Sequence, residues 1–72
     1  MTLFTERLIA LRHSHGISQT EVSKNIKINL RTYQRYEKGE REPRMSELIA
    51  LADYFNVSID YLVGRTDNPE KF

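Results

Sequence analysis

Glycine and asparagine residues divide this chain at regular intervals, and they limit what it can fold into. Gly16, Gly39, Asn56 and Gly64 each follow a segment whose apolar residues recur at helical spacing. Just past the end of a helix, glycine or asparagine takes the left-handed backbone conformation that closes the helix. No stretch of useful length alternates apolar and polar residues, as a half-buried strand would. The sequence therefore predicts an all-α fold made of short helices.

Five helices are expected, at about residues 3–15, 18–26, 29–38, 45–55 and 59–63. Serine, threonine and asparagine favour the first turn of a helix because their side-chain oxygens accept hydrogen bonds from free backbone N–H groups. The spacing of Ser18 and Glu21 is that of a capping box, in which the two residues satisfy each other's backbone N–H groups. The expected caps are Thr2, Ser18, Asn29 and Ser58.

The second and third predicted helices are separated by residues 27–29 alone. So short a link between two short helices forces a sharp corner and brings them into close contact. The fourth predicted helix has a long apolar face. We expect it to bury Met45, Leu48, Leu51, Ala52 and Phe55.

The length of 72 residues supports one small domain. The chain has no cysteine, so neither disulfides nor thiolate–metal sites supplement its core, and helix packing must supply the stability. We place the domain at residues 1–66. Residues 67–72 are expected to form a short frayed tail, because Pro69 and its polar neighbours favour no regular element.

Several classes of function are disfavoured by the sequence. His13 and His15 are too few for a structural zinc site, and at i and i+2 on a helix they point to different sides. No nucleophile–base pair or phosphate-binding loop is present, so we expect neither an enzyme nor a metal, cofactor or small-molecule site. No apolar run approaches the length of a membrane span, and Glu6 and Arg7 interrupt any signal-peptide core. A cytoplasmic location is expected.

Charge is distributed unevenly along the chain, although the net charge is only +1. Residues 21–45 carry seven cations against four anions, whereas residues 46–72 carry two cations against five anions. A basic middle segment beside an acidic end is a hint of a polyanionic partner for the middle segment. Many solvated protein surfaces have similar patterns, so charge alone does not settle the matter.

The third predicted helix separates its aromatic residues from its cations. At 100° per residue, one arc of about 140° holds the side chains of Leu30, Arg31, Gln34, Arg35 and Lys38. Tyr33 and Tyr36 point away from this arc and are expected in the core. Arginine matches guanine O6 and N7, and glutamine matches adenine N6 and N7, each with two hydrogen bonds. The alternative is an ordinary solvated face of a surface helix.

The segments "SQTEVSKNIKINLRTYQRYEKGEREP" and "LADYFNVSIDYLVG" resemble the lambda-repressor/Cro-like (XRE-type) helix-turn-helix DNA-binding family. The resemblance covers roughly residues 4–64, and its landmark positions fall in register without an internal gap. It implies a compact five-helix domain in which the second and third helices form the helix-turn-helix. The third helix would then be the recognition helix, which lies in the major groove of double-stranded DNA.

The resemblance also implies roles for individual residues. Base-reading positions correspond to Leu30, Arg31, Gln34 and Arg35, and an ion pair linking the first helix to the third corresponds to Arg12 and Glu37. Positions that contact phosphates correspond to Gln19, Thr32, Lys38, Arg41 and Arg44.

Three residues depart from the family pattern. Lys27 and Asn56 replace usual glycines, and Arg44 replaces a usual helix cap. A non-glycine residue at the position of Lys27 accepts the left-handed conformation at a cost of about 1–2 kcal/mol. These departures leave the motif intact, but Arg44 makes the start of the fourth helix less certain.

The function implied is sequence-specific binding of double-stranded DNA by a transcriptional regulator, most simply a repressor. One recognition helix reads few base pairs, so a homodimer on a pseudo-palindromic operator is expected, with half-sites about 34 Å apart. The fifth helix and the tail, with Tyr61, Val63 and Phe72, are the expected dimer surface. An alternative is a protein-binding module, such as an antitoxin or adaptor, that uses its acidic fourth and fifth helices.

Overall fold

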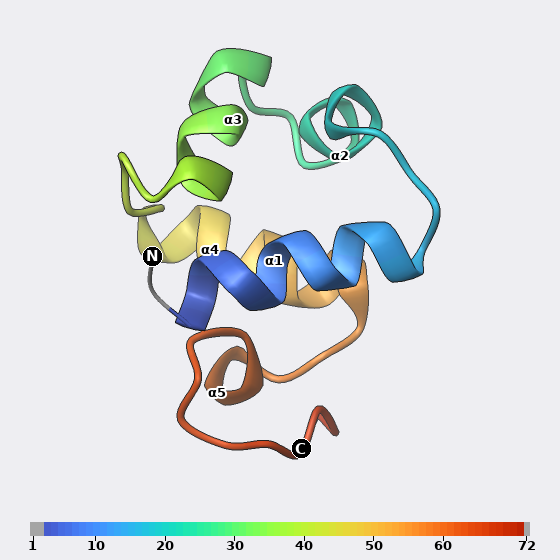
Figure 1. Ribbon diagram of the computed structural model, residues 1–72, viewed down its shortest axis with the longest axis vertical. Coiled ribbons are helices and arrows are strands. Elements are labelled where there is room, and N and C mark those ends of the chain that lie inside the picture. Colours follow the sequence, from blue (N-terminus) through green and yellow to red (C-terminus); the bar gives the residue numbers. More distant parts are fainter. Residues whose placement is uncertain (1–2, 72) are drawn as a thin grey trace.

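The computed structural model describes residues 3–71, and these residues form five helices and no strand. The predicted all-α fold is confirmed, and each described helix end lies within one residue of its expected position. The cap expected at Thr2 lies outside the described residues. In chain order the helices are α1 (Leu3–Ser14), α2 (Gln19–Asn25), α3 (Leu30–Lys38), α4 (Met45–Phe55) and α5 (Ile59–Leu62) (Figure 1).

Side-chain caps begin three of these helices. The Asn29 Oδ1 atom accepts hydrogen bonds from the backbone N–H groups of Arg31 at 2.7 Å and Thr32 at 3.3 Å. Ser18 and Ser58 cap α2 and α5 in the same way. Among the described residues, only half of the predicted capping box is present at α2: the Ser18 hydroxyl accepts from the Glu21 N–H, without the reciprocal bond.

The corner between α2 and α3 depends on a left-handed residue. Lys27 has a φ angle of 60°, as predicted for a residue that replaces glycine at this position. The backbone N–H of Ile28 then reaches back to the carbonyl oxygen of Ser23 at 3.0 Å, which closes α2. The chain can therefore start α3 at once, in a direction that crosses α2.

The core contains the apolar faces of all five helices. Its largest fully buried side chains include Tyr33 and Tyr36 of α3, as predicted, together with Leu8, Leu51 and Leu62. The expectation for Met45 is wrong, because this side chain is 75% exposed. Met45 belongs to the first turn of α4, at the end of the helix that joins the 39–44 loop, where the other helices no longer cover it.

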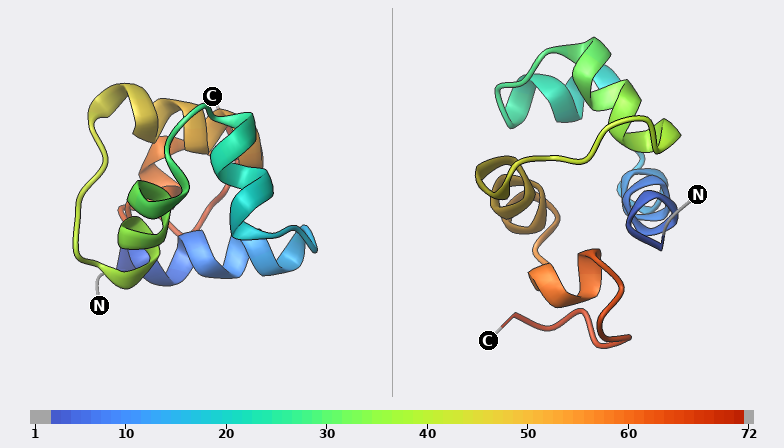
Figure 2. Two further views of the ribbon diagram at one scale, coloured as in Figure 1. Left: turned by 90° about the horizontal axis from the view of Figure 1, so that it is seen from above. Right: turned by 90° about the vertical axis from the view of Figure 1, so that its left-hand side faces the viewer.

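The helix-turn-helix and α5 lie at opposite ends of the molecule. In Figure 1, α2 and α3 are at the top, α1 and α4 cross the middle, and α5 is at the bottom. The right-hand view of Figure 2 shows the same order from another side. Within residues 3–71, no helix is long and apolar enough to cross a membrane.

Residues 67–71 have no regular secondary structure, yet several contacts hold them and Thr66 against the helices. The Arg7 guanidinium donates to the carbonyl oxygens of Tyr61 and Thr66 and to the carboxylate of Asp67. The backbone N–H of Ser58 donates to the Pro69 carbonyl oxygen at 3.0 Å. Arg7 thus supplies partners that the local sequence does not show, and the expected frayed tail stays a prediction. The boundary at residue 66 stays a prediction.

Candidate nucleic-acid interface

A buried carboxylate, that of Glu37, joins the two helices of the helix-turn-helix to each other and to α1. The Glu37 side chain is only 6% exposed, and it forms an ion pair with Arg12 of α1, with 2.6 Å between Arg12 Nε and Glu37 Oε2. A second bond joins Arg12 Nη2 to Glu37 Oε1 at 3.1 Å. The Tyr33 hydroxyl donates to Oε2, and Gln19 Nε2 donates to Oε1 at 2.9 Å. The pair between Arg12 and Glu37 that the resemblance implied is therefore present.

Four hydrogen bonds keep this carboxylate ionised. Burial by itself would raise the pKa of Glu37, but the hydrogen bonds from Arg12, Tyr33 and Gln19 together outweigh it and hold the pKa below its ordinary value. The hydrogen bond to Glu37 in turn raises the pKa of Arg12. Burial, followed by the hydrogen bond to Glu37, raises the pKa of the Tyr33 hydroxyl. At neutral pH, Glu37 is thus an anion that only accepts hydrogen bonds.

Gln19, at the start of α2, connects this buried group to the surface of α3. Its Nε2 atom donates to Glu37, and its Oε1 atom accepts from Gln34 Nε2 at 3.3 Å. Both glutamine side chains are half-buried. Gln19, which is predicted to bind phosphate, is therefore in direct contact with Gln34, which is predicted to read bases.

The outward face of α3 forms a shallow hollow. Leu30, at the start of the helix, is 36% exposed, and Arg31, Arg35 and Lys38 are exposed as well. The predicted base-reading residues thus gather at one place, whereas Thr32 lies beside them, half-buried. The hollow is lined by Leu30, Arg31, Gln34, Arg35, Lys38 and Glu40.

The cations of this face have no carboxylate partner in the described part of the chain. The ion pairs among residues 3–71 join Arg7 to Asp67, Arg12 to Glu37 and Lys71 to Asp53. None of them includes a cation that we predict to contact DNA. The face therefore presents a net positive charge, which a polyanion can neutralise.

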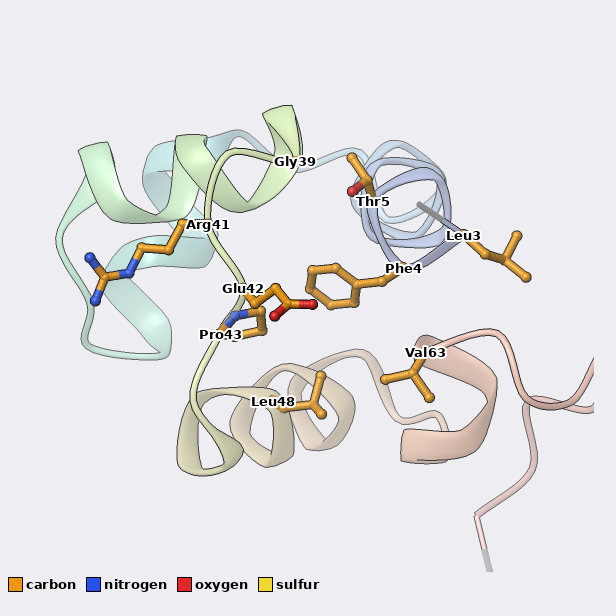
Figure 3. A pocket seen from close by; sticks show the side chains of 9 residues that line it. All are labelled: Leu3, Phe4, Thr5, Gly39, Arg41, Glu42, Pro43, Leu48 and Val63. Carbon is orange, nitrogen blue, oxygen red and sulfur yellow. The ribbon is translucent and has the colours of Figure 1, made fainter. Parts of the chain in front are cut away.

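Arg41 and Arg44 extend the basic surface into the loop between α3 and α4. Arg41 stands beside a second, mainly apolar hollow, into which Phe4, Leu48 and Val63 point (Figure 3). In Figure 3 the guanidinium of Arg41 extends away from that hollow, toward the side on which α2 and α3 lie. Arg44 precedes α4 and is exposed.

Two features of the site escaped the sequence reasoning. Glu40 places an anion in the hollow of α3, because the hydrogen bond from its backbone N–H to the Arg35 carbonyl oxygen folds it back against the helix end. The contact between Gln19 and Gln34 joins residues that are far apart in sequence. A glycine at a helix end is the signal for the first feature, but no local pattern indicates the second.

Comparison with known proteins agrees with this geometry. Residues 8–62 match the model of a family described as helix-turn-helix. The chain belongs to the lambda-repressor-like helix-turn-helix family. The family is one of non-enzymatic DNA-binding domains of transcriptional regulators, so the predicted family and the predicted absence of enzyme activity are confirmed.

Curated relatives of this helix-turn-helix domain include regulators from two bacteria. The cryptic phage CTXphi transcriptional repressor RstR of Vibrio cholerae is 40% identical over 60 residues, which cover 83% of this chain and 54% of that protein. The uncharacterized HTH-type transcriptional regulator YobD of Bacillus subtilis is 32% identical over 68 residues, or 94% of this chain and 61% of that protein. The chain thus spans a little over half the length of these two relatives.

Two solved structures share this fold, and one of them is a complex with DNA. The P22 c2 repressor, crystallised in complex with a synthetic operator, is 30% identical with a TM-score of 0.81, over 88% of this chain and 96% of that one. A transcriptional regulator from Listeria innocua is 39% identical with a TM-score of 0.80, over 85% of this chain and 57% of that one. The five-helix, lambda-repressor-like fold of the helix-turn-helix domain is thereby confirmed.

Proposed function

We propose that this domain binds a specific sequence of double-stranded DNA by placing α3 in the major groove, and that it represses transcription by occupying its operator. In this arrangement Leu30, Arg31, Gln34 and Arg35 face the base edges. The observation that carries the proposal is the contrast in charge pairing. Arg31 and Arg35 have no carboxylate partner among residues 3–71, whereas both arginines of α1 do.

The residues around this face suit the DNA backbone. Lys38, Arg41 and Arg44 are exposed cations beside the end of α3, and cations at such positions bind phosphates at any sequence. Gln19 keeps one free N–H on its amide after its bond to Glu37. That N–H and the half-buried Thr32 complete the proposed set of phosphate contacts. Because its partner is DNA, we place the protein in the cytoplasm.

We further propose that two copies bind a pseudo-palindromic operator. One domain measures 29 × 22 × 21 Å, so two domains in contact are of a size to reach major-groove segments about 34 Å apart. The proposed contact lies at the α5 end, where Val63 lines the apolar hollow and Ile59 is 38% exposed. Tyr61 is less available than the sequence suggested, since the Arg7 guanidinium lies over its ring at 4.1 Å. Phe72 lies outside the described residues.

Selection of bound fragments from a random DNA pool would reveal the operator and its symmetry. Fluorescence anisotropy on that operator then tests the recognition face. We expect Arg31→Ala and Arg35→Ala each to cost about 1–3 kcal/mol of binding and to relax base preference. Sedimentation of the complex should give two chains per palindrome.

Arg65→Ala is the matched control, because Arg65 is an exposed arginine that follows α5, at the other end of the molecule. It loses the same charge, and we expect base preference to be unchanged. If Arg31→Ala and Arg35→Ala leave base preference as it is in the wild type, α3 does not read the operator. DNA binding that is absent, or insensitive to salt, would favour the protein-binding module instead.

A further inference from the structure

Three glutamine and glutamate side chains form a chain of hydrogen bonds from the core to the DNA-facing surface. Gln34 donates to Gln19 over 3.3 Å, and Gln19 donates to Glu37 over 2.9 Å. At the inner end Glu37 is 6% exposed and is held from its other sides by Arg12 and Tyr33. The outer end, Gln34, lines the hollow of α3.

The direction of this chain follows from chemistry. An ionised carboxylate only accepts hydrogen bonds, so Gln19 must turn its NH₂ group toward Glu37. Its carbonyl oxygen Oε1 then faces Gln34, which must in turn offer its own NH₂ group. The two ends of a glutamine amide are nearly identical in shape, and usually only the hydrogen-bond network distinguishes them. Here one buried anion sets the orientation of both amides.

The orientation leaves a defined set of free groups on Gln34. One N–H bonds to Gln19, so the second N–H and the carbonyl oxygen remain free. That pair is one donor and one acceptor on the same planar amide, the combination that matches N7 and N6 of adenine. The guanidinium groups of Arg31 and Arg35, by contrast, take part in no ion pair among residues 3–71, so the protein supplies them with no comparable anchor.

We propose that Gln19 and Glu37 are positioning residues for base reading: through Gln19, the Glu37 carboxylate fixes the amide of Gln34 in the orientation that reads DNA. This inference rests on the proposed function of α3. It adds that Gln19 contributes to sequence preference as well as to affinity. A residue that only binds phosphate lowers affinity equally for every sequence when it is removed.

The test compares base preferences on the selected operator. Gln34→Ala identifies the operator position that Gln34 reads, as the position where the affinity ratio between the preferred and substituted base pairs collapses. We expect Gln19→Met, which keeps the side-chain length but makes no hydrogen bond of this kind, to lower that ratio at least about fivefold, within the range expected for base contacts. In a Gln34→Ala background, Gln19→Met should leave the ratio unchanged.

Tyr33→Phe is the matched control, because it removes a different hydrogen bond to Glu37 and leaves Gln19 in place. We expect it to lower thermal stability and to preserve the ratio. If Gln19→Met weakens binding by the same factor for every base pair at that position, the inference is overturned. It is also overturned if Gln34→Ala changes no ratio, even where Arg31→Ala and Arg35→Ala relax preference and the proposed function stands.

A measurement on the wild-type protein does not depend on any variant folding. In ¹H–¹⁵N spectra without DNA, one Nε2 proton of Gln34 should be shifted by its hydrogen bond, should show contacts to the Gln19 side chain, and should exchange slowly with water. Gln34 amide protons that behave as those of a free glutamine would overturn the inference.

Discussion

Helices α1 and α3 each carry two arginines, and the structure uses the two pairs in opposite ways. In α1, the guanidiniums of Arg7 and Arg12 pair with the carboxylates of Asp67 and Glu37, and both arginine side chains are 14% exposed. In α3, Arg31 and Arg35 are exposed and have no carboxylate partner among residues 3–71. The number of cations on a helix therefore says little about the role of that helix. The informative property is whether carboxylates of the same protein already pair with those cations.

The largest expected effect concerns the paired arginine Arg12. Glu37→Gln removes the charge that compensates a half-buried guanidinium, and we expect it to lower the free energy of unfolding by about 3 kcal/mol. Urea denaturation measures this change. Glu70→Gln makes the same substitution at an exposed residue and should change stability by less than about 0.5 kcal/mol. Equal stabilities of Glu37→Gln and the wild type would mean that the pair is dispensable and that the comparison fails.

The same pair predicts a dependence of stability on pH. Because the folded protein holds the pKa of Glu37 below the ordinary value, the folded state binds this proton less readily than the unfolded state does. The stabilisation is therefore complete above the unfolded pKa and is lost as pH falls through the folded pKa. Stability of the wild type relative to Glu37→Gln should decline in acid below about pH 4.5. A constant difference down to the folded pKa would contradict the assigned ion pair.

A smaller effect is expected for Arg7, whose partners lie near the C-terminal end. Arg7→Ala removes bonds to two carbonyl oxygens and to Asp67, as well as the contact with the Tyr61 ring. We expect a loss of about 1–2 kcal/mol in unfolding free energy. The affinity of the folded protein for DNA should be unchanged. Lys71→Ala, which breaks the exposed pair with Asp53, should cost under about 0.5 kcal/mol by comparison.

The smallest effect on stability is expected for Arg41, a cation that forms no ion pair among residues 3–71. We expect Arg41→Ala to leave the unfolding free energy within about 0.5 kcal/mol of the wild type. Binding should weaken for all DNA sequences alike, and the slope of log affinity against log salt should flatten by about one. Anisotropy titrations at several salt concentrations measure both quantities. A loss confined to the operator would instead assign Arg41 to the bases.

Local signals in the sequence predicted most of the fold. Asn29 and Gly39 mark the two ends of α3, and helical spacing separates Tyr33 and Tyr36 from the cations. These signals work because caps and periodicity act within a few residues. The prediction that Met45 is buried was wrong because burial depends on which other helices pack against a residue. The apolar spacing of α4 extends to its first turn, where no other helix among residues 3–71 covers Met45.

The candidate site was likewise predicted from the sequence only in part. The outward residues of α3 followed from one helix's periodicity, whereas the pair of Arg12 and Glu37 was implied only by the family resemblance. The contact between Gln19 and Gln34 was missed altogether. It joins residues of two helices whose relative placement is set by the corner at Lys27, and a single sequence does not specify which side chains meet across such a corner.

The contacts that hold residues 66–71 against the helices have a practical consequence for optical experiments. The chain has no cysteine, so Glu70→Cys would give a single thiol for attaching a dye. Glu70 is exposed, and it belongs to the segment at the end of the molecule away from α3. Because neighbouring residues are tied to the helices, a dye with a short linker would tumble with the whole domain. Its depolarisation would then report the slower rotation of a DNA complex while the dye stays clear of α3.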